Sequence, residues 1–337
     1  MLKLVNSGLA DEFEFRRFTT SRPPKRGTID NWGYGAVLRG GVGRLIVGAL
    51  VTLKHVLAFP FQVARVDIVQ IQASDFLTFW EAIYYVLTAR LLRRRVVMRL
   101  GGAFDRFYDA SPNAVRAMIR WAIRRPHRLI VQSRYWAELV AGLGRTEGVF
   151  VLPNWVPDRL IASRQRGDGP VTCLFIAGSE ARRKGIALVL EAARALPGIS
   201  FRIVAAPDLP PLPNLSGCGV LDHPALLEEM RAADIFALPS FGEGFPNSLV
   251  EAMALGLPSI ATPVGAVPEI IADGINGRMI PLGDAKTLAK AIAELANDRA
   301  ARLEMGRQAQ QTVAERYSES RIVERVRGLY RELNSAS

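Results

Sequence analysis

The residues whose types and spacing point most clearly to chemistry lie between Ala233 and Ile271. A short apolar run at 235–238 predicts a buried strand, and the loop after it contains Gly242 and Gly244. In doubly wound sheets, ligands bind at the loops that follow the carboxyl ends of strands. Because glycine carries no side chain, a ligand can approach the main chain of this loop closely.

A helix is predicted to follow this loop, beginning at Pro246 or Asn247. The proline ring fixes the backbone angle that a first helical turn needs. The N–H groups of Asn247, Ser248 and Leu249 would then be free and point out of the helix start, where the helix dipole is positive. Free N–H groups at such an end bind anions, so we expect a diphosphate there.

Two carboxylates flank this predicted anion site. Glu243 lies in the loop, and Glu251 falls in the second turn of the helix, eight positions later. Carboxylates repel a diphosphate, but they accept hydrogen bonds from sugar hydroxyls, which carry no charge. Taken alone, both glutamates would be ordinary solvated side chains. The surrounding loop, prolines and helix argue instead for a ligand that joins a sugar to a diphosphate.

The elements that must position these residues alternate along most of the chain. Short apolar runs are predicted as strands at 14–18, 67–72, 95–100, 129–132, 149–152, 172–177, 200–205, 235–238, 259–261 and 278–280. The chain ends in amphipathic helices predicted at 285–295, 300–317 and 320–333. Continuous apolar strands with helical crossovers are typical of parallel sheets covered on both faces. The expected fold class is therefore α/β, with two doubly wound, Rossmann-like domains.

A polar, glycine-containing segment at 158–170 marks the expected domain boundary. Residues 1–160 then form one domain and residues 161–337 the other, which suits a chain of this length. Doubly wound domains open with a strand, a glycine-rich turn and a helix. Residues 1–18 instead indicate the end of a helix that runs into a strand, so we expect the first domain to lack its usual N-terminal strand.

Composition excludes several classes of protein. With 49% hydrophobic and 22% charged residues, the chain is an ordinary globular protein and neither disordered nor fibrous. Its two cysteines, Cys173 and Cys218, and its three histidines argue against a disulfide scaffold and against a metal site built from these residues. We expect a reducing, cytoplasmic compartment, because no export signal is visible at the N-terminus.

The positive charge is concentrated in the first half of the chain. Residues 1–170 contain 26 of the 43 basic and 13 of the 32 acidic residues. A basic domain suits a negatively charged partner: a nucleic acid, an anionic membrane surface or a phosphorylated substrate. A generally arginine-rich composition is the alternative explanation. The apolar stretches 45–59 and 76–92 are too short to span a membrane and are expected to be core or interfacial helices.

Glu243 and Glu251, with GFPNSLV between them, resemble the E-x7-E motif of retaining GT-B glycosyltransferases, the group 1 family that uses nucleotide-sugar donors. The segments LPNWVPDR, LFIAGSEARRKGIALVLEAA and DGINGRMIPLGD are similar to further segments of that family. The likeness covers nearly all of the second half and, more loosely, residues 66–154. It implies a GT-B fold and a retaining hexosyltransferase that uses a UDP or GDP sugar as co-substrate, with no metal ion and no other cofactor.

The resemblance also implies roles for individual residues. Glu251 would hold the ribose hydroxyls of the donor, and Glu243 would hold the transferred sugar. The base would be contacted mostly through the backbone around 221–224. The main-chain contacts to the sugar and diphosphate would come from Gly244, Phe245, Pro246, Asn247, Ser248 and Leu249.

In the family, an arginine and a lysine in the arrangement Gly-Arg-x4-Lys-Gly neutralise the diphosphate. Gly178 and Lys184 match this pattern, but Ser179 stands where the family has arginine. Arg182 or Arg183 is expected to supply the second positive charge. Because a cation beside a leaving diphosphate accelerates transfer strongly, Ser179 predicts either such a substitute or reduced activity.

The segment RLGGAFDRFYDASP at 99–112 is similar to the Gly-Gly-x-Phe loop of family members that act in bacterial surface-polysaccharide assembly. Arg99, Gly101 and Gly102 are therefore predicted on the acceptor side, although a tight turn explains the two glycines equally well. Many relatives carry a histidine in this loop, which this chain lacks. The expected acceptor is a glycan or a lipid-linked sugar, and the basic first half suits the inner face of the cell membrane.

Other functions are consistent with parts of the sequence. A catalytically weak GT-B binding or accessory subunit would fit the missing strand, Ser179 and the loop without histidine. A dinucleotide-dependent enzyme is disfavoured, because no GxGxxG follows a strand. We expect no nucleic-acid partner, because the sequence has no helix-turn-helix, RRM or KH signature.

Overall fold

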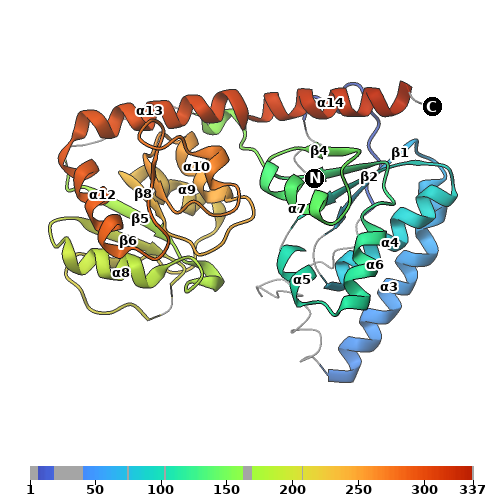
Figure 1. Ribbon diagram of the computed structural model, residues 1–337, viewed down its shortest axis with the longest axis horizontal. Coiled ribbons are helices and arrows are strands. Elements are labelled where there is room, and N and C mark those ends of the chain that lie inside the picture. The colour runs from blue at the N-terminus through green and yellow to red at the C-terminus, as the bar shows by residue number, and fades with distance from the viewer. Residues whose placement is uncertain are drawn as a thin grey trace. The chain divides into compact units, whose positions relative to one another are not determined.

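The computed structural model describes residues 7–18, 41–73, 76–101, 104–161, 169–206 and 208–335. The chain divides into two compact units, one of residues 1–130 together with 327–337 and one of residues 131–326. Both units contain alternating helices and parallel strands, which are labelled in Figure 1. The domain boundary predicted at 160/161 remains a prediction.

The first unit is built on parallel strands joined by helices. Its elements are α3 (Gly41–Val63), β1 (Ile68–Ala73), α4 (Phe76–Leu91), β2 (Arg95–Leu100), α5 (Phe104–Ala110), α6 (Asn113–Ala122) and β3 (Arg128–Val131). β2 lies between β1 and β3 and pairs with both in parallel. Five of the six residues of β2 are buried, as expected for a strand covered on both faces.

The second unit carries a larger sheet. The strands within residues 131–326 are β4 (Val149–Val151), β5 (Thr172–Ile176), β6 (Ser200–Val204), β7 (Leu215–Gly217), β8 (Ile235–Leu238), β9 (Ser259–Ala261) and β10 (Arg278–Met279), and the larger sheet contains all of these except β4. Its helices are α7 (Arg134–Gly142), α8 (Ile186–Ala195), α9 (His223–Ala232), α10 (Asn247–Ala254), α11 (Val267–Ile270), α12 (Ala285–Asn297) and α13 (Arg299–Arg316). Six strands form one sheet in the order β10-β9-β8-β5-β6-β7, and all pairs are parallel. Last in the chain is α14 (Glu319–Ser335).

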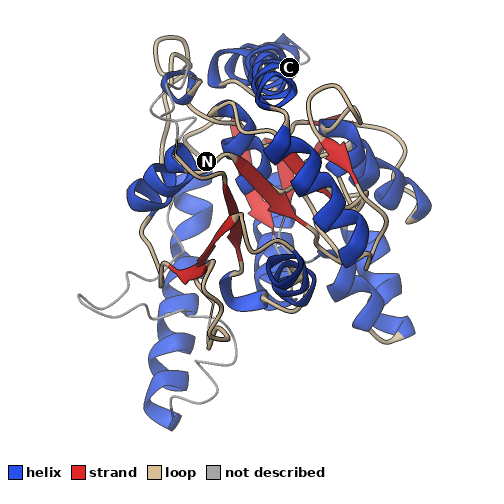
Figure 2. Ribbon diagram, turned by 90° about the vertical axis from the view of Figure 1, so that its left-hand side faces the viewer, coloured by secondary structure: helices blue, strands red, loops and turns tan. Residues whose placement is uncertain are grey.

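The core of the second unit lies on both faces of this sheet. Along β8, Ile235 and Ala237 contribute to a cluster that includes α8 and α12, whereas Phe236 and Leu238 contribute to one that includes α10 and α13. Figure 2 shows helices around the strands of this unit. An all-apolar strand with successive side chains pointing to opposite faces is what two covered faces require.

The predicted strand at 14–18 is wrong, because Glu14–Phe18 is an irregular segment. Instead of pairing with a strand, this part of the chain makes aromatic contacts with distant residues. The Phe13 ring meets Tyr330 edge-on at 5.4 Å, and Phe18 meets Phe59 at 5.5 Å. These two aromatic contacts attach Phe13 and Phe18 to other parts of the first unit.

The sequence did not predict β7, a three-residue edge strand. Leu215–Gly217 contains a serine and a glycine and no β-branched residue, so it lacks the composition of a strand. It forms because it pairs in parallel with β6, with Phe201 opposite Leu215. The other predicted strands from residue 67 onward are confirmed to within one residue at either end.

The two apolar stretches that were expected to be core or interfacial helices form α3 and α4. In α4, the buried side chains include Phe79, Val86 and Ala89, so most of its apolar surface packs inside the unit. Across the ranges that the structure describes, no helix combines the length and the apolar character needed to cross a membrane.

Candidate functional site

The loop between β5 and α8 carries the predicted cationic residues. After β5, the chain turns through a 3-10 segment, Gly178–Glu180, which includes Ser179. Gly185 then adopts a φ of 86°, and a Cβ atom there would overlap the carbonyl group of Pro239. Glycine is required on both grounds, because other residues avoid this backbone region and would also clash. The loop that holds Lys184 is thereby packed against the end of β8.

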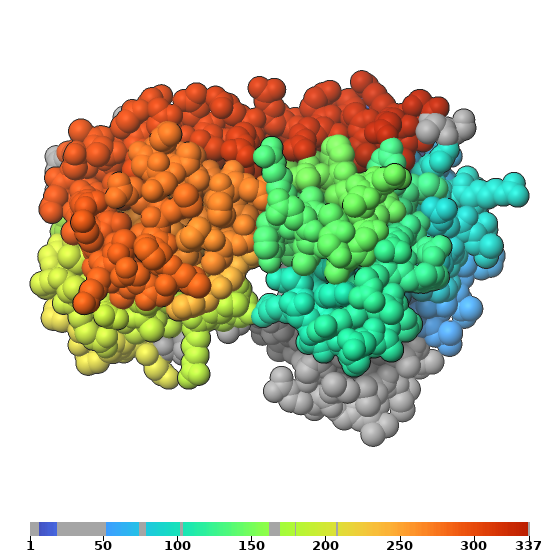
Figure 3. Space-filling model, in the orientation of Figure 1, coloured from blue at the N-terminus to red at the C-terminus, as the bar shows by residue number. Residues whose placement is uncertain are grey.

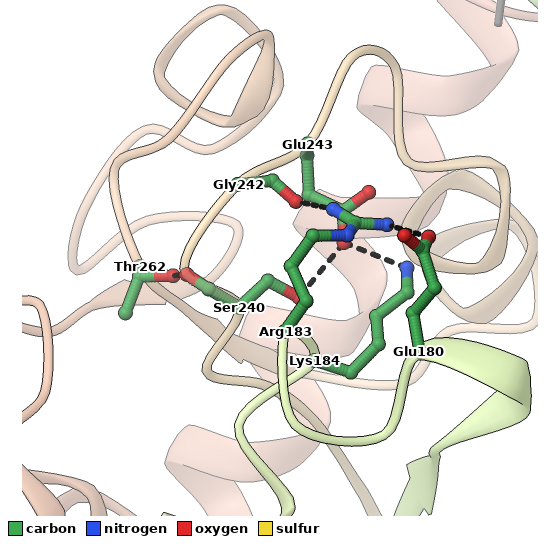
Figure 4. Close-up of polar contacts among 7 residues, drawn as sticks. All are labelled: Glu180, Arg183, Lys184, Ser240, Gly242, Glu243 and Thr262. Atoms are coloured by element: carbon green, nitrogen blue, oxygen red, sulfur yellow. Dashed lines mark hydrogen bonds and ion pairs between the residues drawn. The ribbon is translucent and has the colours of Figure 1, made fainter. Parts of the chain in front are cut away.

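Lys184 and Glu243, which were predicted to have separate roles in the site, are in direct contact (Figure 4). Lys184 Nζ lies 2.7 Å from Glu243 Oε1, and Ser240 Oγ donates to the same oxygen at 2.8 Å. The Glu243 side chain is 6% exposed and that of Lys184 is 20% exposed. A carboxylate with so little access to water depends on these donors, so removing either partner leaves a poorly solvated charge.

Ser240 belongs to this site, although the sequence analysis did not select it. It is fully buried just after β8, and its carbonyl oxygen accepts a hydrogen bond from Thr262 Oγ1 at 2.5 Å. Figure 4 shows the Ser240 side chain directed at the Glu243 carboxylate. The signal in the sequence was its position at the carboxyl end of a buried strand, where site residues gather.

Arg183 links the two loops of the site. Its Nη2 lies 2.5 Å from Glu180 Oε2, and its Nη1 donates to the carbonyl oxygen of Gly242. In the main chain, Phe241 N donates to Arg183 O at 2.8 Å. Arg182 is exposed. Which of the two arginines acts as the second cation beside a diphosphate remains a prediction.

The predicted anion site lies at the start of α10. The helix begins at Asn247 as expected, and no side chain caps its N-terminus. Leu249 N donates to Pro246 O at 3.2 Å, so the expectation of a free N–H group is wrong for Leu249. Among the described residues, no acceptor engages the N–H groups of Asn247 and Ser248. Two donors of the first turn therefore remain to bind an anion.

Close packing fixes the glycine-containing loop. Gly265 has a φ of 55°, and a Cβ atom there would overlap the carbonyl group of Glu243. A Cβ atom on Gly244 would lie 3.4 Å from the ring of Trp136, which is itself buried. Gly265 is therefore required by its neighbour, whereas a Cβ atom on Gly244 would make only an ordinary contact. A ligand contact to Gly242 or Gly244 stays a prediction. Phe245 is buried and packs edge-on against Tyr317 at 5.8 Å.

Glu251 lies one turn into α10 and contacts a residue that the sequence analysis did not select. His223 Nε2 is 2.9 Å from Glu251 Oε1, and His223 is the first residue of α9. The resemblance pointed only to the backbone around 221–224, as a contact to the base. A pair of residues 28 positions apart on two helices has no signature in the sequence.

The predicted acceptor-side residues lie in the first unit. Arg99, in β2, is 6% exposed, and burial lowers the pKa of its guanidinium to about 10. Gly101 N donates to Ala73 O at 3.0 Å and so extends the pairing of β1 with β2. This contact continues the strand pairing, and both the acceptor-side role of Gly101 and the tight turn remain predictions. Gly102 lies outside the described residues.

The described residues contain no three His, Cys, Asp or Glu side chains placed to share a metal ion. Cys173 is fully buried in β5, and burial raises the pKa of its thiol to about 12. Cys218 Sγ lies 3.7 Å from Glu229 Oε2.

A cavity of about 540 Å³ in the second unit shares a single residue, Phe245, with the predicted site. It is also lined by Glu269, whose carboxylate accepts hydrogen bonds from Arg134 N and Tyr135 N at 2.9 Å each. Glu269 thereby caps the N-terminus of α7, where a negative charge is favourable. The sequence analysis did not identify this role.

The part of the chain that contains the candidate site matches a known protein family. Residues 170–298 match the family described as "Glycosyl transferases group 1". The matched segment begins just before β5, ends just after α12, and includes Lys184, Glu243 and Glu251.

Curated relatives match over part of their length. A phosphatidyl-myo-inositol mannosyltransferase of Mycobacterium leprae is 32% identical over 188 residues, which is 49% of this chain and 48% of that protein. A D-inositol 3-phosphate glycosyltransferase of Saccharomonospora viridis is 28% identical over 68% of this chain and 53% of that protein. The chain thus spans about half the length of the curated relatives it matches.

Solved structures show the same fold over most of the chain. Sucrose-phosphate synthase from Thermosynechococcus elongatus has a TM-score of 0.70 at 21% identity, covering 85% of this chain and 79% of its own. HepE from Anabaena, solved in complex with UDP, has a TM-score of 0.70 at 18% identity and covers 84% of both chains. The chain therefore has the GT-B fold of two Rossmann-like domains, and its residues 170–298 match the Glycosyl transferases group 1 family.

Proposed function

We propose that this protein is a retaining, metal-independent glycosyltransferase. It moves a hexose from a UDP or GDP sugar to a glycan or a lipid-linked acceptor, in the assembly of cell-surface polysaccharide. The observation that carries the proposal is the buried contact between Lys184 and Glu243, since Glu243 lies four residues before Asn247, the uncapped start of α10. The proposal is supported by a cation, Lys184, in contact with a carboxylate that can accept hydrogen bonds from sugar hydroxyls, and by two free N–H donors that follow this carboxylate at the start of α10.

The same contact indicates how the donor enters. In the free protein, Lys184 and Glu243 form an ion pair, so each of the two charges has a partner. A nucleotide sugar offers both of them a better-matched partner, since its diphosphate suits the ammonium and its sugar hydroxyls suit the carboxylate. Donor binding would therefore open the ion pair and use both of its members.

The reaction then exchanges two bonds at the anomeric carbon. The bond to the β-phosphate oxygen breaks, and the acceptor oxygen bonds to the same face of the sugar. The acceptor proton passes to the departing phosphate oxygen. Lys184, once released from Glu243, and the N–H groups of Asn247 and Ser248 offset the negative charge that builds on the phosphate and so stabilise the leaving group.

The names of the relatives support this class of reaction. One is called a phosphatidyl-myo-inositol mannosyltransferase and another a D-inositol 3-phosphate glycosyltransferase. The Anabaena neighbour was solved with UDP and with UDP-glucose. These proteins motivate a test with both UDP and GDP sugars.

A panel of UDP and GDP sugars tests the proposal with the purified chain. A ligand at about 100 times its Kd should raise the free energy of unfolding by ~2.7 kcal/mol, which is visible in thermal denaturation. Hydrolysis or transfer of the same donor should be unchanged by EDTA, and proton NMR should show that the anomeric configuration is retained. Loss of activity with EDTA that Mg²⁺ restores would contradict metal independence. Stabilisation without turnover would instead favour the catalytically weak accessory subunit.

We further propose that the first unit docks on an anionic membrane surface through α3. Leu53, Leu57 and Phe61 are 52%, 61% and 75% exposed and lie four positions apart, hence on one face of the helix. Phe59 and Val63, on the opposite face, are buried. Part of α3 is visible in light blue at the surface in Figure 3. An exposed apolar stripe in the basic half of the chain suits an interface that is both apolar and negatively charged.

Changing Leu57 to aspartate should weaken binding to vesicles of phosphatidylcholine and phosphatidylglycerol by roughly tenfold, because one leucine no longer enters the apolar layer. Co-sedimentation at physiological salt measures the effect. The matched control is Leu303→Asp, which changes a leucine of similar exposure on α13. Equal binding of the two variants, or no binding by the unmodified chain, would rule out docking through α3.

A further inference from the structure

The second glutamate of the predicted donor site has a single side-chain partner. His223 Nε2 lies 2.9 Å from Glu251 Oε1, and within the described residues no other group is hydrogen-bonded to this carboxylate. The Glu251 side chain is 14% exposed, whereas His223 is 57% exposed. Because a carboxylate accepts hydrogen bonds, the imidazole is the donor and its proton is on Nε2.

The position of His223 is fixed by the start of α9. The Asp222 side chain caps this helix by accepting a hydrogen bond from Ala225 N at 2.9 Å. Leu226 N donates to Asp222 O at 2.9 Å, and Pro224 occupies the second position of the helix. A side-chain cap and a proline in the first turn both hold the backbone in place. The imidazole therefore extends from a fixed point toward Glu251.

The contact leaves acceptor capacity on Glu251. A carboxylate offers about four lone-pair positions on its two oxygens. His223 uses one position on Oε1, so Oε2 and a second position on Oε1 are open to further donors. Two neighbouring hydroxyls, such as the 2′ and 3′ hydroxyls of a ribose, match the number and spacing of these acceptors. The hydrogen bond from His223 sets the plane in which they are presented.

We propose that His223 is a positioning residue that orients Glu251 toward the ribose hydroxyls of a bound nucleoside diphosphate. This inference rests on the proposed function and adds a residue to it. His223 acts through Glu251, so its contribution depends on the hydroxyls that Glu251 accepts. A ligand without those hydroxyls should be insensitive to His223.

Isothermal titration calorimetry with two ligands tests this dependence. One is UDP or GDP, whichever the unmodified chain binds more tightly, and the other is its 2′,3′-dideoxy form. His223→Ala should weaken binding of the ribose ligand by roughly tenfold, as expected for loss of a hydrogen bond to a charged group. Binding of the dideoxy ligand should be unchanged. His223→Gln, which retains an N–H donor near the position of Nε2, should restore most of the affinity for the ribose ligand.

Glu228→Gln provides the matched control, because Glu228 lies on α9 in an exposed pair with Arg231. It should change neither affinity. If His223→Ala weakens both ligands by the same factor, His223 is a general structural residue and the inference is overturned, while the proposed function stands. If the unmodified chain binds neither UDP nor GDP, the proposed function and this inference fail together.

Discussion

Replacing Lys184 by methionine should lower the rate of sugar transfer, or of donor hydrolysis, by roughly two to three orders of magnitude. In the proposed mechanism the Lys184 ammonium stabilises the departing diphosphate, and losing one donor that stabilises developing negative charge costs about 10² to 10³ in kcat. Ser179 is uncharged, so only Arg182 or Arg183 is expected to compensate in part. Steady-state kinetics at saturating donor measure the effect.

Two further variants make the Lys184 result interpretable. Lys184→Met leaves the buried Glu243 carboxylate without its cation, which destabilises the fold as well as the reaction. The double variant Lys184→Met with Glu243→Gln removes that charge and should recover thermal stability without recovering activity. Lys290→Met, at an exposed position of α12, controls for the loss of a surface lysine. Full activity of Lys184→Met would exclude Lys184 from the reaction.

Changing Glu243 to glutamine should separate binding of the nucleotide from transfer of the sugar. Transfer should fall by roughly 100-fold, because the amide cannot match the carboxylate as an acceptor for sugar hydroxyls in the transition state. Free UDP or GDP should bind as tightly as before or more tightly, because Lys184 no longer has to leave an ion pair. Calorimetry gives the affinity, and product formation gives the rate.

Glu294→Gln is the matched control for this variant, since Glu294 forms exposed ion pairs in α12 and should affect neither quantity. Weaker nucleotide binding by Glu243→Gln would mean that Glu243 supports the fold of the nucleotide site. Unchanged transfer would mean that Glu243 does not hold the sugar.

The sequence predicted those parts of the fold that depend on local composition. β8 is a continuous apolar run, and the structure gives it the predicted bounds because both faces of the sheet are covered. The start of α10 was predicted from Pro246 for a similarly local reason. The strand predicted at Glu14–Phe18 is wrong, because the segment is irregular and Phe18 packs against the distant residue Phe59. β7 was missed because pairing with β6, and not its own composition, makes it a strand.

The candidate site shows the same division between local and distant information. The spacing of Glu243 and Glu251 is local and was visible in the sequence. Lys184 was selected by its spacing from Gly178, but spacing left Arg182 and Arg183 as alternatives. The structure shows that Arg183 pairs with Glu180 and that Arg182 is exposed. The bond between His223 and Glu251 joins two helices, α9 and α10, that are separated along the chain, so only the folded chain reveals it.

We expect a diphosphate to bind at the start of α10 beside Lys184, between Glu243 and Glu251. A crystal structure of the chain with its preferred nucleotide sugar tests this directly. Phosphate oxygens should lie within hydrogen-bonding distance of Asn247 N and Ser248 N, with Lys184 Nζ moved from Glu243 to the diphosphate. A nucleotide sugar bound elsewhere, or bound here with the 2.7 Å contact between Lys184 and Glu243 intact, would contradict it.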